Sequence, residues 1–130
     1  MDRSVLHRRI FFAGGIWNLA MGVPIFLLVP WLPSLLKITE PLYPVFIYFN
    51  LMTVTMFGLV TLVVSRHVNE MRPIIAILVW SKILTFAVFI GAYLWTSMPG
   101  ELTEFLVGGM IVDLCLGFAY WKIWADVGKQ

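Results

Sequence analysis

The sequence predicts an all-α fold, an integral membrane four-helix bundle with both termini in the cytoplasm, and three observations lead to it. The 130 residues are 61% hydrophobic and 12% charged, and this charged fraction is about half that of ordinary soluble domains. The apolar residues form four blocks of similar length, and basic residues collect at one set of block ends. A water-soluble core cannot hold so much apolar surface, so we expect a single transmembrane domain over residues 1–130.

The apolar blocks predict helices over residues 11–30, 44–64, 73–94 and 106–124. Each block has about 20 residues, which at about 1.5 Å rise per residue matches a hydrocarbon core of about 30 Å. A signal peptide is the competing interpretation of the first block, because Arg3, Arg8 and Arg9 precede it. The block is too long for the apolar part of a signal peptide, and no small-x-small cleavage motif follows Pro30. We therefore expect a retained helix.

The linkers indicate which helices are neighbours. "SRHVNEMRP" and "TSMPGELTE" are short turns before the third and fourth helices, so each of these helices should lie antiparallel to the one before it. The linker "WLPSLLKITEPLYP" is longer, broken by proline and still apolar, and we expect it to lie in the outer membrane interface. A re-entrant dip into the membrane is less favoured, because Lys37 and Glu40 would be costly at depth.

Basic and aromatic residues predict the orientation of the bundle. One basic residue, Lys37, lies in the two linkers assigned to the outside. Seven lie on the side assigned to the cytoplasm: Arg3, Arg8, Arg9, Arg66, Arg72, Lys122 and Lys129. We expect aromatic anchors at the outer interface, including Trp31 and Trp95, and at the inner interface, namely Tyr120, Trp121 and Trp124.

Composition also excludes several function classes. The net charge of +2 is small and its carriers are scattered, which argues against nucleic-acid binding. A lone cysteine, Cys115, excludes an intramolecular disulfide and a cysteine-based zinc site. His7 and His67 are poor material for a metal site, so we expect no metal and no cofactor. No catalytic set is visible at membrane depth, which favours a protein that is not an enzyme.

Lys82 lies near the middle of the third block, where a charge costs about 2.5 to 3.5 kcal/mol on insertion scales. It lies nine residues after Pro73, and Asp113 lies nine residues before Lys122. Both side chains are therefore about 13 Å from the cytoplasmic boundary. Because the third and fourth helices are antiparallel neighbours, we predict an ion pair between Lys82 and Asp113.

Two more polar residues fall at a similar depth, Asn18 on the first helix and Thr55 on the second. We predict a buried polar layer of Asn18, Thr55, Lys82 and Asp113. Such a layer can fix the register of the helices, as buried polar residues do elsewhere. It can also hold a ligand, proton or ion, because ionisable residues within membranes are candidates for function, or it can contact another protein. We favour the structural role.

Small residues flank the polar layer at intervals of four. Small residues on this spacing let membrane helices approach closely. The predicted helix-packing positions are Gly14 and Gly22 around Asn18, and Gly109 and Gly117 around Asp113.

The order of short motifs along the chain resembles that of a broad group of small four-helix bacterial membrane proteins near the DoxX-like assemblage. The motifs are "GGIWN", "YPVFIYFN", "FG", "RP", "SK" and a late "D". The resemblance spans nearly the whole chain. It implies a four-helix architecture and a bacterial inner membrane, and it carries over no catalytic residues.

Three functions fit these observations. We favour an accessory or scaffolding subunit of a larger membrane complex, whose partners are membrane lipid and other subunits or further copies of the chain. The first alternative is a small oligomeric transporter or proton-coupled carrier that uses Lys82 and Asp113. The second alternative is a lipid- or quinone-binding membrane protein that uses the polar layer as a head-group pocket.

Overall fold

The computed structural model describes residues 3–35, 44–95 and 100–128, and these residues form four long helices and one short helix. The long helices are α1 (Arg3–Leu28), α3 (Pro44–Arg66), α4 (Arg72–Trp95) and α5 (Gly100–Val127), and the short helix is α2 (Leu32–Leu35). Within the described ranges, each of the four long helices contains a segment long and apolar enough to cross a membrane. The chain is an all-helical bundle, and these segments indicate an integral membrane protein.

The observed helices are longer than the apolar blocks, mainly at their polar ends. α1 begins at Arg3, eight residues before the predicted start, and α5 continues to Val127. Hydropathy detects only the part of a helix that suits hydrocarbon, whereas the backbone hydrogen bonds of a helix continue into the interface. Pro44 and Pro73 both lie in the first turn of their helices, where the missing N–H removes no hydrogen bond.

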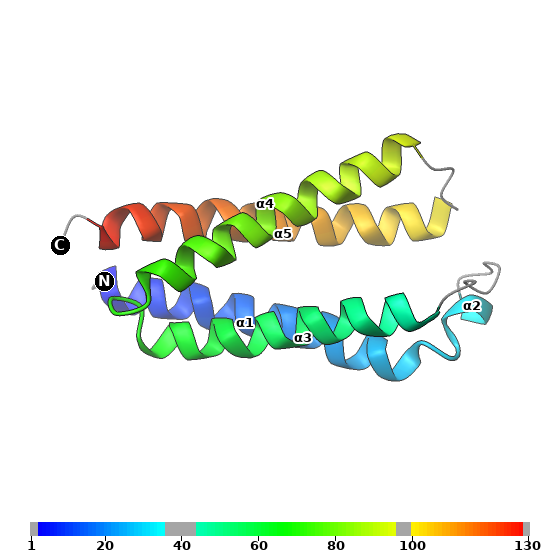
Figure 1. Ribbon diagram of the computed structural model, residues 1–130, viewed down its shortest axis with the longest axis horizontal. Coiled ribbons are helices and arrows are strands. Elements are labelled where there is room, and N and C mark those ends of the chain that lie inside the picture. The colour runs from blue at the N-terminus through cyan, green and yellow to red at the C-terminus, as the bar shows by residue number, and fades with distance from the viewer. Residues whose placement is uncertain (1–2, 36–43, 96–99, 129–130) are drawn as a thin grey trace.

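The helices are arranged as two pairs (Figure 1). α1 packs closely against α3, α4 packs against α5, and contacts between the two pairs are far fewer. Both chain termini and the turn between α3 and α4 lie at one end of the bundle, which we call the terminal end. The opposite end, where α3 begins and α4 finishes, is the distal end.

Glycine residues allow the close contact within the α1/α3 pair. A Cβ atom on Gly15 would lie 2.6 Å from Leu62 Cδ2, and one on Gly22 would lie 2.4 Å from the Thr55 hydroxyl oxygen. From the other side, a Cβ on Gly58 would lie 3.2 Å from the Asn18 Cβ. Larger residues at these positions would push the two helices apart.

The buried hydrophobic cluster joins all four long helices toward the terminal end. It consists of Phe11, Val64, Val68, Ile75, Leu78, Val79, Tyr120 and Ile123. On α4 the buried residues stop at Lys82, and no residue from 83 to 95 is buried. Figure 1 shows α4 diverging from the α1/α3 pair in this direction. The bundle is therefore packed in its terminal half and looser in its distal half.

The linker predicted to lie in the outer interface is described only in part. α2 occupies residues 32–35, and Trp31 and Leu35 are exposed. Lys37 and Glu40 lie outside the described residues.

Candidate functional site

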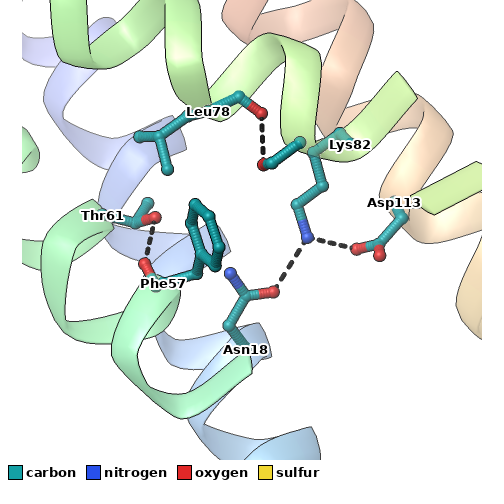
Figure 2. A network of polar contacts seen from close by, with 7 residues as sticks. Asn18, Phe57, Thr61, Leu78, Lys82 and Asp113 are labelled. Atoms are coloured by element: carbon teal, nitrogen blue, oxygen red, sulfur yellow. Dashed lines mark hydrogen bonds and ion pairs between the residues drawn. The ribbon is translucent and has the colours of Figure 1, made fainter. Parts of the chain in front are cut away.

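Three of the four predicted polar-layer residues meet between the helix pairs (Figure 2). The Lys82 ammonium on α4 donates hydrogen bonds to Asp113 Oδ1 on α5, at 2.5 Å, and to Asn18 Oδ1 on α1, at 2.9 Å. We call Asn18, Lys82 and Asp113 the polar triad. It connects the α4/α5 pair to the α1/α3 pair at the point where the buried part of α4 ends.

The local sequence of α5 helps to place the lysine. Gly117 lies one turn from Asp113 on the same helix face, and a Cβ on Gly117 would lie 3.2 Å from the Lys82 Cβ. The missing side chain therefore leaves room for the stem of Lys82 beside α5. From that position the flexible four-carbon stem brings the ammonium to the carboxylate.

The two charged groups differ in exposure. The Lys82 side chain is 8% exposed and the Asp113 side chain is 19% exposed, while Asn18 is buried. A buried ammonium loses the solvation of water, and its attraction to the carboxylate, together with the hydrogen bond to the amide oxygen, offsets that loss. The carboxylate is the more accessible member of the pair.

The structure does not bring Thr55 into this network. The Thr55 hydroxyl donates to the carbonyl of Leu51, at 2.8 Å, and lies beside Gly22. A threonine on a helix can satisfy its hydroxyl with the carbonyl four residues earlier, so it does not need a partner on another helix. Thr55 is part of the α1/α3 contact instead.

The predicted packing glycines also divide. Gly14, Gly22 and Gly117 each lie against a side chain of a neighbouring helix, whereas a Cβ on Gly109 would find no atom within 4 Å. Gly109 lies about one helical turn before Asp113, toward the distal end, where the two helix pairs pack less closely against each other. Its placement as a helix-packing position is therefore not supported by the contacts.

The predicted tryptophan anchors are exposed with one exception. Trp31, Trp95 and Trp121 are more than half exposed. Trp124 is partly buried against the core cluster, and the Arg72 guanidinium lies 5.1 Å from its ring centroid. Trp124 therefore joins the start of α4 to the end of α5 through a cation–π contact.

Tyr120 lies in the core and not at the interface, where we expected an aromatic anchor. Its side chain is fully buried and stacks on Phe11, with ring centroids 4.4 Å apart. The hydroxyl lies against Gly14, on which a Cβ would clash with it. A tyrosine near a helix end resembles an anchor in sequence, and only the fold places it opposite a glycine on another helix.

Sequence reasoning also missed the burial of His7. The imidazole lies 3.9 Å from the Asp126 carboxylate and connects α1 to α5 at the terminal end. His7, Phe11, Gly14 and Asn18 follow the spacing of one helix face. That periodicity, extended back beyond the apolar block, could have indicated the burial.

Among the residues described, no three His, Cys, Asp or Glu side chains are grouped so that they could hold a metal ion. No protein-family model, curated protein or solved structure matches the chain, so the resemblance to DoxX-like proteins stays a prediction. The polar triad can hold helices together. Alternatively, the Asp113 carboxylate can leave Lys82 and bind another cation.

Proposed function

We propose that the protein is an accessory or scaffolding subunit of a larger membrane complex. In this proposal the polar triad fixes the bundle, and the outward faces of the helices bind partner subunits. The proposal is supported by an internal network that pairs the charges of Lys82 and Asp113 with each other, together with helices whose apolar surface points mainly outward. Between 17% and 28% of the apolar segment of each long helix is buried inside the chain.

The observation that carries the proposal is the position of Trp80. It lies eight residues after Arg72, about 12 Å along α4, and 63% of it is exposed. Tryptophan is enriched at the two membrane interfaces, where its indole N–H finds a polar partner. In hydrocarbon that N–H would have no acceptor, which is costly. A neighbouring protein helix that offers a carbonyl or hydroxyl would remove this cost.

Blue-native electrophoresis of membranes solubilised in a mild detergent tests the proposal. We expect the parent protein to migrate with other subunits or in several copies, and the Trp80→Leu variant to lose most of this association. Trp121→Leu is the matched control, because Trp121 is also exposed, at 54%, but lies near the end of α5. A parent protein that migrates as a free monomer contradicts the proposal.

We further propose that both termini face the cytoplasm of a bacterial inner membrane. Both termini lie at the terminal end (Figure 1). Six basic residues occur in the polar segments of the described helices and turn there: Arg3, Arg8, Arg9, Arg66, Arg72 and Lys122. Basic residues favour the cytoplasmic side. A green fluorescent protein fused to the C-terminus should fluoresce in bacteria, and active alkaline phosphatase in the same fusion position would overturn this orientation.

A second candidate function is proton-coupled transport, which the partial exposure of Asp113 favours. In this alternative the carboxylate leaves Lys82 when it takes up a proton or cation. The flux of this proton or cation into liposomes should then be lost in the Asp113→Asn variant. Equal flux through the parent and this variant would remove the candidate.

A further inference from the structure

A small polar pocket lies at the terminal end, apart from the polar triad. Two helices and a turn form it: Ser4 and Arg8 belong to α1, Arg66 ends α3, and His67, Asn69 and Glu70 belong to the turn before α4. Its volume is about 80 Å³. Sites for drug-sized ligands measure about 300 Å³ or more, so this pocket fits a single small group.

The lining of the pocket suits an anion. Arg8 and Arg66 come from different helices, and a guanidinium presents several N–H donors in the geometry that matches phosphate oxygens. Asn69 and His67 supply further donors. Glu70 is the one acidic group among the described residues that line the pocket. Its carboxylate lies 3.6 Å from His67 Nδ1, and its side chain is 79% exposed, so water weakens its repulsion of an anion.

The position of the pocket indicates where such an anion comes from. Arg66 is the last residue of α3, and Arg8 lies just before the apolar part of α1. In a bundle whose long helices cross a membrane, these residues lie at the level of the lipid phosphates. Further basic side chains at the same end, Arg3, Arg9 and Arg72, add to the attraction of anionic lipid.

We infer that this pocket binds the phosphate group of an anionic phospholipid. The lipid phosphate accepts hydrogen bonds from Arg8 and Arg66, and the acyl chains lie along the apolar faces of α1 and α3. Inorganic phosphate offers the same chemistry without the acyl chains, so a test has to separate the two sources.

Native mass spectrometry of the full chain in a nonionic detergent provides the test. The probes are phosphatidylglycerol, phosphatidylcholine and inorganic phosphate. We expect the parent protein to bind phosphatidylglycerol about tenfold more tightly than phosphatidylcholine, whose choline group cancels the head-group charge. Persistence of the bound phosphatidylglycerol in millimolar inorganic phosphate supports a lipid site, and its displacement assigns the pocket to free anions and overturns the lipid assignment.

Paired variants test whether the pocket itself is responsible. The double variant Arg8→Gln with Arg66→Gln should weaken phosphatidylglycerol binding by about 25-fold, at about fivefold for each arginine. The control is Arg3→Gln with Arg9→Gln, which removes the same charge from exposed positions of α1 outside the pocket. We expect a smaller loss in this control, because neither Arg3 nor Arg9 lines the pocket. Equal losses in the two double variants would show diffuse attraction and overturn the inference.

Glu70→Gln keeps the test decisive if the arginine variants fold poorly. This change removes the acidic group of the pocket at an exposed position of the turn. Phosphatidylglycerol binding should then become modestly tighter, because water already weakens the repulsion by this exposed carboxylate. Unchanged or weaker binding in a folded Glu70→Gln protein would contradict the pocket as the binding site.

Discussion

Lys82 is a buried charge within a membrane segment, and two partners on different helices offset the cost of burying it. The ammonium contacts Asp113 and Asn18 and is 8% exposed. In a buried pair of this kind the loss of one partner costs more than the loss of both, because the remaining charge has neither water nor a counter-ion. Stability therefore depends on the match between the two charges.

We expect Lys82→Met and Asp113→Leu each to lower the free energy of unfolding by about 3 kcal/mol or more. The double variant should lose less than either single variant, because no charge is left unmatched. Titration of the purified protein with sodium dodecyl sulfate in mixed micelles measures all three values. Additive losses would argue against direct pairing of the two side chains.

Asn18 should contribute less than either charged residue. Asn18→Ala removes the acceptor at 2.9 Å from the ammonium and leaves the ion pair in place. Hydrogen bonds between membrane helices are worth about 0.6 kcal/mol on average and at most about 1.7. The same titration should give a loss in this range, and a loss as large as that of Asp113→Leu would assign Asn18 a larger role than its single contact indicates.

Helix packing depends on where the glycines lie more than on how many there are. Gly14 accommodates the Tyr120 side chain from α5, and Gly22 accommodates Thr55 from α3, whereas Gly109 has open space around it. All three belong to stripes of the same spacing in the sequence. They differ in whether they contact a neighbouring helix.

Gly14→Ala should destabilise the bundle by about 1 to 3 kcal/mol, because the added methyl clashes with the Tyr120 hydroxyl in a filled core. Gly109→Ala is the matched control, and we expect it to change the free energy of unfolding by less than about 0.5 kcal/mol or to increase it. Tyr120→Phe, combined with Gly14→Ala, should recover part of the loss. Equal losses at positions 14 and 109 would contradict the packing described for these helices.

At the scale of the whole molecule, the two helix pairs are joined in the terminal half and less packed against each other in the distal half. The buried cluster and Lys82 mark the joined part. No residue of α4 from 83 to 95 is buried. We therefore expect the distances between pairs to vary more toward the distal end.

Spin labels on exposed positions of α1 and α4 can measure this difference. In electron–electron double resonance, labels at Leu27 and Val88 in the distal half should give a broader distance distribution than labels at Val5 and Ile77 in the terminal half. A bound partner should narrow the distal distribution. Equal widths at both ends of the unbound protein would contradict a looser distal half.

The helices and the ion pair could be predicted from the sequence because each depends on one dominant cost. Apolar length places a helix in the membrane, and a charge at depth requires an opposite charge at the same depth on a neighbouring helix. Lys82 and Asp113 have opposite charges, the same predicted depth and positions on neighbouring helices. Counting residues gives depth and says little about direction around the helix axis, which is why Thr55 was expected in the layer.

Tyr120 and Gly109 depend on packing between segments far apart in the chain. Tyr120 can point inward because Gly14 on α1 leaves space for its ring. Gly109 has no neighbour among the described residues because the two helix pairs diverge toward the distal end. Neither feature has a periodic signature in one sequence. The pocket around Arg8 and Arg66 likewise arises only when α1 and the turn after α3 come together.

Lys82 is the last residue of α4 that is buried, so a tilt of α4 relative to the other helices would be centred near this residue. Sliding of α4 along its axis by one turn would separate the ammonium from both oxygens at once, whereas tilting about this point would leave them almost stationary. The triad therefore restrains α4 more strongly against sliding along its axis than against tilting. A partner subunit of the kind proposed above, bound to the distal part of α4, would thus change the angle of this helix without breaking the contact between Lys82 and Asp113.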